Sequence, residues 1–121
     1  MKDVKSPKGK ELSKPLLKRL TDYMWGKLHS PIYVEDMASK SNMSTFHFAR
    51  SFKKTTGHSP HKYLTTMRLE KAVSLMENDD ISLADVASES GFSDQAHFTR
   101  VFKKRMGTTP AAYRKKLKKS A

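Results

Sequence analysis

The sequence predicts an all-α fold in which one helical unit occurs twice. Apolar residues recur at intervals of three and four, as in amphipathic helices, and no segment alternates with the period of two expected for a strand. Residues 47–63 match residues 97–113 at nine of seventeen positions, and residues 32–44 match residues 81–93 at six of thirteen. Self-similarity at a fixed spacing defines the structural unit. We therefore expect two related subdomains.

Residues that typically begin or end helices indicate where the helices of the first copy lie. Pro15 suits a first helical position, Ser30-Pro31 interrupts the apolar pattern, Asn42 favours a turn, and Gly57 follows the last periodic residue. The predicted helices cover about 15–29, 34–41 and 45–55.

The second copy begins after a longer helix. Ser59-Pro60 combines a capping residue with a first-turn proline, Asn78-Asp79-Asp80 stops the pattern, Ser82 caps a short helix, and Gly91 makes a turn. The predicted helices cover about 60–77, 83–90, 94–105 and a short segment from 110 to 113, about seven helices in all. We expect a disordered basic arm, a first subdomain, a linker helix, a second subdomain and a basic tail, over residues 1–14, 15–58, 59–77, 78–116 and 117–121 respectively.

Each copy has the layout of a helix-turn-helix, in which the second helix lies in the DNA major groove. Asn42 and Gly91 stand at the turns, and both residue types tolerate a left-handed backbone. At 100° per residue each longer helix divides into two sides. The expected buried sides are Phe48, Ser51, Phe52 and Thr55 in the first copy, and Phe98, Val101, Phe102 and Met106 in the second.

The opposite sides carry side chains suited to reading bases. Arg50 and Arg100 can pair with guanine, and Gln95 with adenine. Apolar contact with a thymine methyl suits Phe46, Ala49, Ala96 and the methyl group of Thr99. The expected base-facing residues are Thr45, Phe46, Ala49, Arg50, Gln95, Ala96, Thr99 and Arg100. The expected phosphate contacts are Lys53, Lys54, Lys103 and Lys104, one turn later.

The linker length sets a spacing. Eighteen helical residues span about 27 Å, whereas successive major-groove faces are about 34 Å apart. We expect such a helix to hold two reading heads near one DNA turn apart and to favour bending of the duplex, at a cost of about 1–6 kcal/mol.

Charge supports a polyanionic partner. The 24 Lys and Arg residues outnumber 12 Asp and Glu, giving a formal charge of +12, which points first to nucleic acid. Residues 103–121 hold eight basic and no acidic residues, while residues 21–102 are nearly neutral. Basic tails that bind nucleic acid or other polyanions without sequence preference are therefore the alternative. Docking of a protein through the Met-rich linker is a third reading, although core packing explains those residues more simply.

The sequence lacks the residues that an enzyme, a metal-binding protein or a membrane protein would need. The chain has no cysteine, which excludes disulfides, cysteine–zinc sites and thiol catalysis. The five histidines form no catalytic set, and Pro60 between His58 and His61 favours a turn over a metal site. No apolar run approaches the roughly 20 residues of a membrane span. We expect a soluble cytoplasmic protein that is not an enzyme and binds no cofactor, metal or membrane.

The second copy, ISLADVASESGFSDQAHFTRVFKKRMGTTPAAYRK, resembles the DNA-binding domain of AraC/XylS-type bacterial transcriptional regulators. The MSTFHFARSFKKTTGHSP and MRLEKAVSLM segments resemble it too, so the likeness covers about 16–116. It implies monomeric contact with two adjacent major-groove segments of double-stranded DNA, activation through RNA polymerase and a place at the nucleoid. Positions matching Phe46, Ala49 and Arg50, and Gln95, Ala96, Thr99 and Arg100, commonly face bases in such domains.

Two positions depart from the family pattern. Asn42 replaces the more frequent turn glycine, and Ala49 is small where a longer polar residue is common. The first head is therefore expected to read fewer bases by hydrogen bonding. The chain has no room for the effector-binding domain of many members, which predicts a small stand-alone regulator or an excised DNA-binding domain, without a small-molecule effector site.

Overall fold

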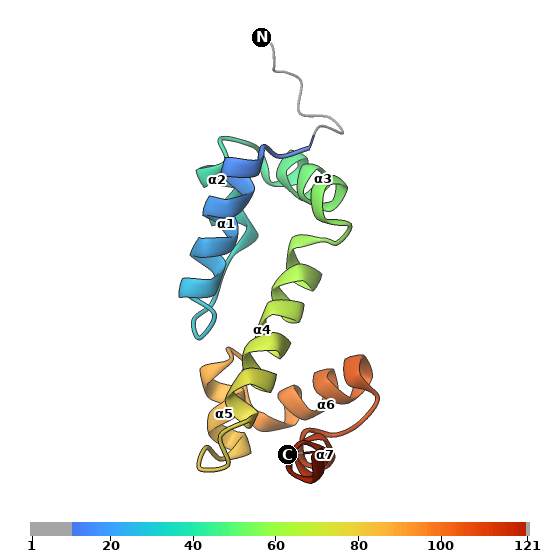
Figure 1. Ribbon diagram of the computed structural model, residues 1–121. Helices are drawn as coiled ribbons and strands as arrows, with labels where there is room; N and C mark the ends of the chain where they lie inside the picture. The colour runs from blue at the N-terminus through green and yellow to red at the C-terminus, as the bar shows by residue number, and fades with distance from the viewer. Residues whose placement is uncertain (1–10, 121) are drawn as a thin grey trace. The chain divides into compact units, whose positions relative to one another are not determined.

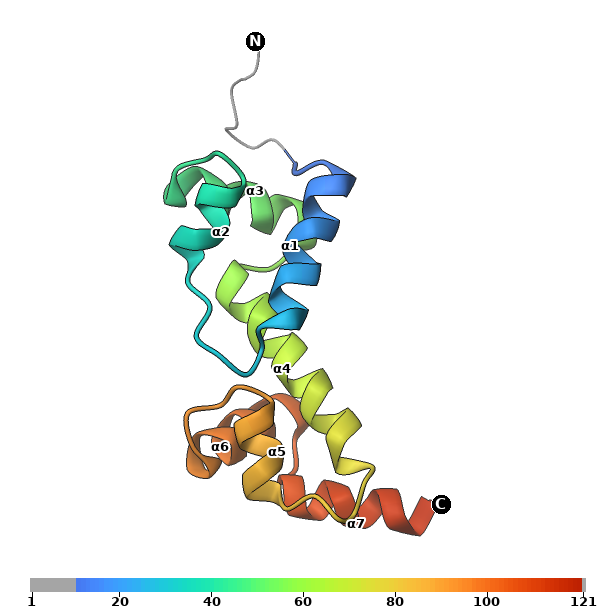
Figure 2. The same cartoon turned by 90° about the vertical axis from the view of Figure 1, so that its left-hand side faces the viewer.

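The computed structural model describes residues 11–120, whose elements can be followed in chain order in Figures 1 and 2. This range forms seven α-helices and no strand, which confirms the expected all-α fold. The chain divides into two compact units. The first unit comprises the described residues up to Lys27 together with Pro31–Thr66, and the second comprises Leu28–Ser30 together with the described residues from Met67 onward. The boundary falls within the helix that we expected as a separate linker over 59–77.

The first unit contains α1 (Lys14–Gly26), α2 (Val34–Lys40), α3 (Thr45–Thr56) and the start of α4 (Pro60–Met76). The Ser13 hydroxyl accepts a hydrogen bond from the Leu16 N–H at 3.2 Å, so α1 begins on a serine cap. Apolar side chains at helical spacing are buried in this unit: Leu12, Leu20, Met24, Met37, Ala38, Phe48, Phe52 and Leu64.

The start of the first unit differs from the expected disordered arm over 1–14. Residues 1–10 lie outside the described residues. Leu12 is buried, and its N–H donates to the Thr55 hydroxyl at 2.8 Å. The packed structure thus begins before α1. At its other end α1 stops at Gly26, three residues short of the expected His29, and glycine is a poor helix former.

The second unit contains the end of α4, then α5 (Leu83–Glu89), α6 (Gln95–Met106) and α7 (Pro110–Ser120). One apolar cluster holds it together: Leu69, Ala72, Met76, Val86, Ala87, Phe92, Phe98 and Phe102. Phe102 meets Tyr113 edge to face at 5.5 Å between ring centres, as Phe52 meets Tyr63 at 5.2 Å in the first unit. The repeated sequence therefore produces a repeated packing arrangement.

Two expectations about the second unit were wrong. Met106 was expected on the buried side of α6, but as the last residue of the helix it is 41% exposed. The last helix was expected to give way to a tail after Tyr113, yet α7 continues to Ser120. Arg, Lys and Leu are good helix formers, and Leu117 packs against the apolar cluster, so both propensity and burial extend α7.

Two arginines of the second unit bind the ends of preceding chain segments. The Arg114 guanidinium donates to the carbonyls of Met76 and Asn78, at 3.2 and 3.3 Å. In the same pattern, Arg68 donates to the carbonyls of Leu28 and Ser30, at 3.2 and 3.1 Å. Burial lowers the pKa of the Arg68 guanidinium. A planar fork of donors suits two carbonyls that lie two residues apart.

Candidate nucleic-acid interface

The two helix-turn-helix turns have the same backbone hydrogen bonds. The Met43 N–H donates to the Ala38 carbonyl across the first turn, and the Phe92 N–H donates to the Ala87 carbonyl across the second, both at 3.0 Å. Asn42 and Gly91 adopt left-handed φ angles of 58° and 96°. The expected turn conformation is therefore confirmed in both copies. A left-handed residue after a helix lets the chain reverse while the last carbonyls keep their donors.

The surroundings of Gly91 also leave no room for a side chain. A Cβ atom there would overlap the Leu28 carbonyl oxygen and press on Nε of Arg68. Arg68 holds that same carbonyl by a hydrogen bond, so the oxygen has little freedom to retreat. Asn42 instead has an exposed side chain. This difference explains why a residue with a side chain is accommodated at the first turn and glycine stands at the second.

Both recognition helices, α3 and α6, begin and end on equivalent residues. The Ser44 hydroxyl accepts from the His47 N–H at 3.2 Å, and the Asp94 carboxylate accepts from the His97 N–H at 2.7 Å. Gly57 and Gly107 end the helices in the left-handed conformation, with φ of 85° and 80°. The two helices therefore have the same length, a polar side-chain cap at the start and a left-handed glycine at the end.

The buried sides of the recognition helices determine which side chains face outward. Phe48 and Phe52 in α3, and Phe98 and Phe102 in α6, are fully buried, and each pair of rings lies 5.6 Å apart. The sequence-predicted base-facing residues lie on the other side. Ala49 and Thr99 are half-buried, and the rest are exposed: Thr45, Phe46, Arg50, Gln95, Ala96 and Arg100. The four lysines expected to meet phosphates are exposed as well: Lys53, Lys54, Lys103 and Lys104.

An aromatic contact distinguishes the outer side of α3. Phe46 is 65% exposed, and the Arg50 guanidinium lies over its ring at 5.4 Å from the ring centre. A guanidinium stacked on a ring is attracted by its electrons and loses some of its rotational freedom. In α6 the equivalent position is Ala96, so Arg100 has no such neighbour at that place. The two recognition helices therefore present their arginines differently.

Sequence reasoning missed Arg105, an exposed basic residue in the last turn of α6. Its counterpart in the first copy is Thr55, so the repeat gives no signal for a basic residue at this position. His97 packs its ring against Phe92 at 5.6 Å between ring centres, and its Nδ1 lies 3.3 Å from the Ser93 hydroxyl, so its side chain has a packing role in the second unit. Among residues 11–120, no group of three or more His, Asp or Glu side chains could hold a metal ion. In the same range no helix has the length and apolar character to cross a membrane.

Comparison with known proteins identifies the family of the chain. Residues 37–116 match the family model described as a helix-turn-helix domain, and solved AraC-type DNA-binding domains share the fold. The chain belongs to the AraC/XylS family of transcriptional regulators. The matched range includes both turns and both recognition helices.

Several named proteins are similar to this chain in sequence or in structure. The MmsAB operon regulatory protein of Pseudomonas aeruginosa is 35% identical over 79% of this chain and 31% of its own length. The probable transcription factor PqrA of Proteus vulgaris is 41% identical over 69% of this chain and 68% of its own length. The solved DNA-binding domain of the global transcriptional factor AdpA, in complex with a target DNA, has a TM-score of 0.76 and 34% identity, covering 84% of this chain and 91% of that one. The chain spans about a third of the length of several curated relatives.

Proposed function

We propose that this chain is a bacterial transcriptional regulator, or the DNA-binding part of one, that reads a specific double-stranded DNA site with α3 and α6. One observation carries the proposal. The two helix-turn-helix units share turn, caps and buried phenylalanines, but differ at the outward positions where a recognition helix meets bases. If these exposed basic side chains served only to interact with water, nothing would require them on the same face of the same helix in both units.

We assign base reading to the outer sides of the recognition helices. Arg50 and Arg100 pair with guanines, Gln95 pairs with an adenine, and the smaller or apolar side chains contact thymine methyls. The base-facing set is Thr45, Phe46, Ala49, Arg50, Gln95, Ala96, Thr99 and Arg100. The exposed lysines in the last turns meet phosphates: Lys53, Lys54, Lys103 and Lys104.

Several points support the finer parts of the proposal. A related domain, that of AdpA, was solved with a target DNA. Because one chain carries two reading helices with different tips, we propose binding as a monomer to an asymmetric site. A transcriptional activator also meets RNA polymerase, which we propose as the protein partner. Because a regulator of this kind acts on genomic DNA, we also propose that the protein lies at the nucleoid, in the bacterial cytoplasm.

Selection from a random duplex pool tests the proposal directly. The full chain is expected to enrich one sequence, which is then compared with random duplex of equal length by fluorescence anisotropy at 150 mM salt. A specific reader binds its site at least about 10³-fold more tightly than random duplex. A smaller ratio, or no enriched sequence, would instead establish a basic protein that binds polyanions without preference.

A further inference from the structure

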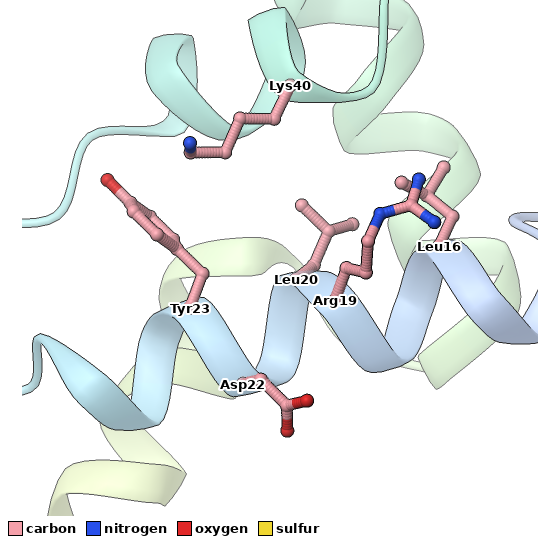
Figure 3. Close-up of a pocket in the computed structure, with 6 residues that line it drawn as sticks. All are labelled: Leu16, Arg19, Leu20, Asp22, Tyr23 and Lys40. Carbon is pink, nitrogen blue, oxygen red and sulfur yellow. The ribbon is translucent and has the colours of Figure 1, made fainter.

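A pocket of about 490 Å³ opens in the first unit between α1 and α2 (Figure 3). Five of its six lining residues lie on α1, and the sixth lies on α2: Leu16, Arg19, Leu20, Asp22, Tyr23 and Lys40. Its volume falls within the range of about 300–1,000 Å³ typical of small-molecule sites. None of its residues has a place in the proposed DNA contacts.

The side chains divide the pocket into an apolar middle and two cationic ends. Figure 3 shows Leu20 rising from α1 at the centre, with Tyr23 and Lys40 on one side and Arg19 beside Leu16 on the other. The Lys40 ammonium lies 4.7 Å from the centre of the Tyr23 ring. One wall is therefore an aromatic ring with a cation above it, and the other end is a guanidinium.

The cations of the pocket have no anionic partner within it. Asp22 is the single carboxylate of the lining, and Figure 3 shows it directed away from Arg19 and Lys40. The Asp22 carboxylate instead forms an ion pair with Lys18, at 3.2 Å between Nζ and Oδ2. A third cation, Lys27, lies 5.6 Å from the centre of the same Tyr23 ring. Concentrated positive charge beside apolar surface attracts an anion that also has an apolar part.

The second copy of the repeat lacks this chemistry. Lys40 corresponds to Glu89 in the aligned segment, so the same place in the second unit carries the opposite charge. The core residues at the neighbouring positions are apolar in both copies, Met37-Ala38 in one and Val86-Ala87 in the other. Packing of the fold therefore does not require Lys40, since a glutamate stands at the equivalent point of the same fold.

We propose that this pocket binds a small organic anion, a carboxylate attached to an aromatic or compact apolar body. The carboxylate pairs with the Lys40 ammonium at one end of the pocket through a charge-assisted hydrogen bond, while Arg19 adds positive charge at the other end. The apolar body covers Leu16 and Leu20 and stacks beside Tyr23. This would be an effector-type site within the DNA-binding chain itself, where the sequence alone led us to expect none.

Nuclear magnetic resonance titration of the isotopically labelled chain without DNA tests the proposal. Benzoate is the probe, benzamide is its uncharged counterpart, and inorganic phosphate is an anion without an apolar body. Benzoate is expected to shift backbone resonances of α1 and α2 saturably. Loss of one charge-assisted contact weakens binding about tenfold or more, so benzamide should bind at least that much more weakly. Phosphate should bind more weakly too, because it lacks apolar contact.

Two charge reversals sharpen the test. Lys40→Glu restores the residue found in the second copy and should weaken benzoate binding about tenfold or more. Lys14→Glu makes the same change at the start of α1, outside the pocket, and should change the affinity by less than about twofold. Phosphate binding as tightly as benzoate, equal effects of both reversals, or no saturable shift by about 10 mM benzoate would each overturn the proposal. Because DNA is absent from the titration, none of these results depends on the proposed regulatory function.

Discussion

Arg50 and Arg100 occupy equivalent positions in α3 and α6, yet their surroundings differ. The Arg50 guanidinium lies over the exposed ring of Phe46, whereas Ala96 stands at that position in α6. Stacking leaves the edge of the guanidinium free to donate, and it limits the orientations that must be given up on binding. If both arginines meet bases as proposed, Arg50 is expected to be better ordered before binding, and Arg100 is expected to rely more on the DNA to order it.

Removing either arginine should lower specific binding while leaving random binding nearly unchanged. Arg50→Ala and Arg100→Ala are each expected to cost about 1–3 kcal/mol on the selected site and to relax base preference at one position. Anisotropy titrations on selected and random duplexes measure both effects. Lys62→Ala, an exposed lysine of α4 outside the proposed contacts, is the control. Equal losses on both duplexes would make these arginines phosphate contacts instead.

The Phe46–Arg50 contact predicts energetic coupling between the two side chains. In a double-mutant cycle on DNA affinity, Phe46→Ala and Arg50→Ala should be non-additive by more than about 0.5 kcal/mol, because the ring orders the guanidinium before it meets DNA and its loss weakens the contact that Arg50 makes. The same cycle with Phe46→Ala and Arg100→Ala should add within about 0.5 kcal/mol, because those residues belong to different units. Additivity in both cycles would mean that the ring and the guanidinium act independently on DNA.

At the scale of elements, the two turns reach one conformation by different means. Both need a left-handed residue, and Asn42 meets that need with a side chain that projects into solvent. Gly91 must in addition leave room for the Leu28 carbonyl that Arg68 holds. The second turn is thus fixed by its neighbours as well as by its own backbone preference, and substitutions there should be less tolerated.

Gly91→Ala is expected to lower the free energy of unfolding by more than about 2 kcal/mol, because strain at positive φ adds to steric overlap. Asn42→Gly should change stability by less than about 1 kcal/mol, since glycine also adopts that conformation readily. Gly26→Ala is the control: nothing lies within 4 Å of the added Cβ there. Urea unfolding followed by circular dichroism ranks the three variants. Equal stability of Gly91→Ala and Gly26→Ala would contradict the packing argument.

Local chemistry explains which elements the sequence predicts well. Caps, turn residues and period-3.6 apolar patterns act within a few residues, so both turns, Gly57, Gly107 and the buried phenylalanines were predictable. The errors concern tertiary contacts. Burial of Leu12 depends on packing and on a bond to Thr55, 43 residues away, and α7 lengthens because Leu117 finds the apolar cluster. The carbonyl partners of Arg68 and Arg114 lie 36 to 40 residues away, beyond any local pattern.

At the scale of the whole molecule, the proposed function implies that duplication separates the residues that fold each unit from the residues that read DNA. The phenylalanines that fill the two units and the glycines that end the recognition helices are the same in both copies. The outward positions Thr45, Phe46 and Ala49 differ from their counterparts Gln95, Ala96 and Thr99. Two recognition helices that share a scaffold but differ in their outward residues are not expected to bind two identical half-sites. The molecule is therefore expected to recognise an asymmetric site, with each half contributed by one recognition helix.

Transplanting the tips tests this division. The triple variant Gln95→Thr, Ala96→Phe and Thr99→Ala gives α6 the outer side of α3 and should keep the fold, because two of these positions are exposed and the third is half-buried. Selection from a random pool should then yield a site whose two halves contain the same bases, whatever their relative orientation. The natural chain, selected in parallel, should yield two different halves. If the second half keeps its natural sequence in the variant, the bases there are read by residues other than these three, and reading would not be separable from the shared scaffold.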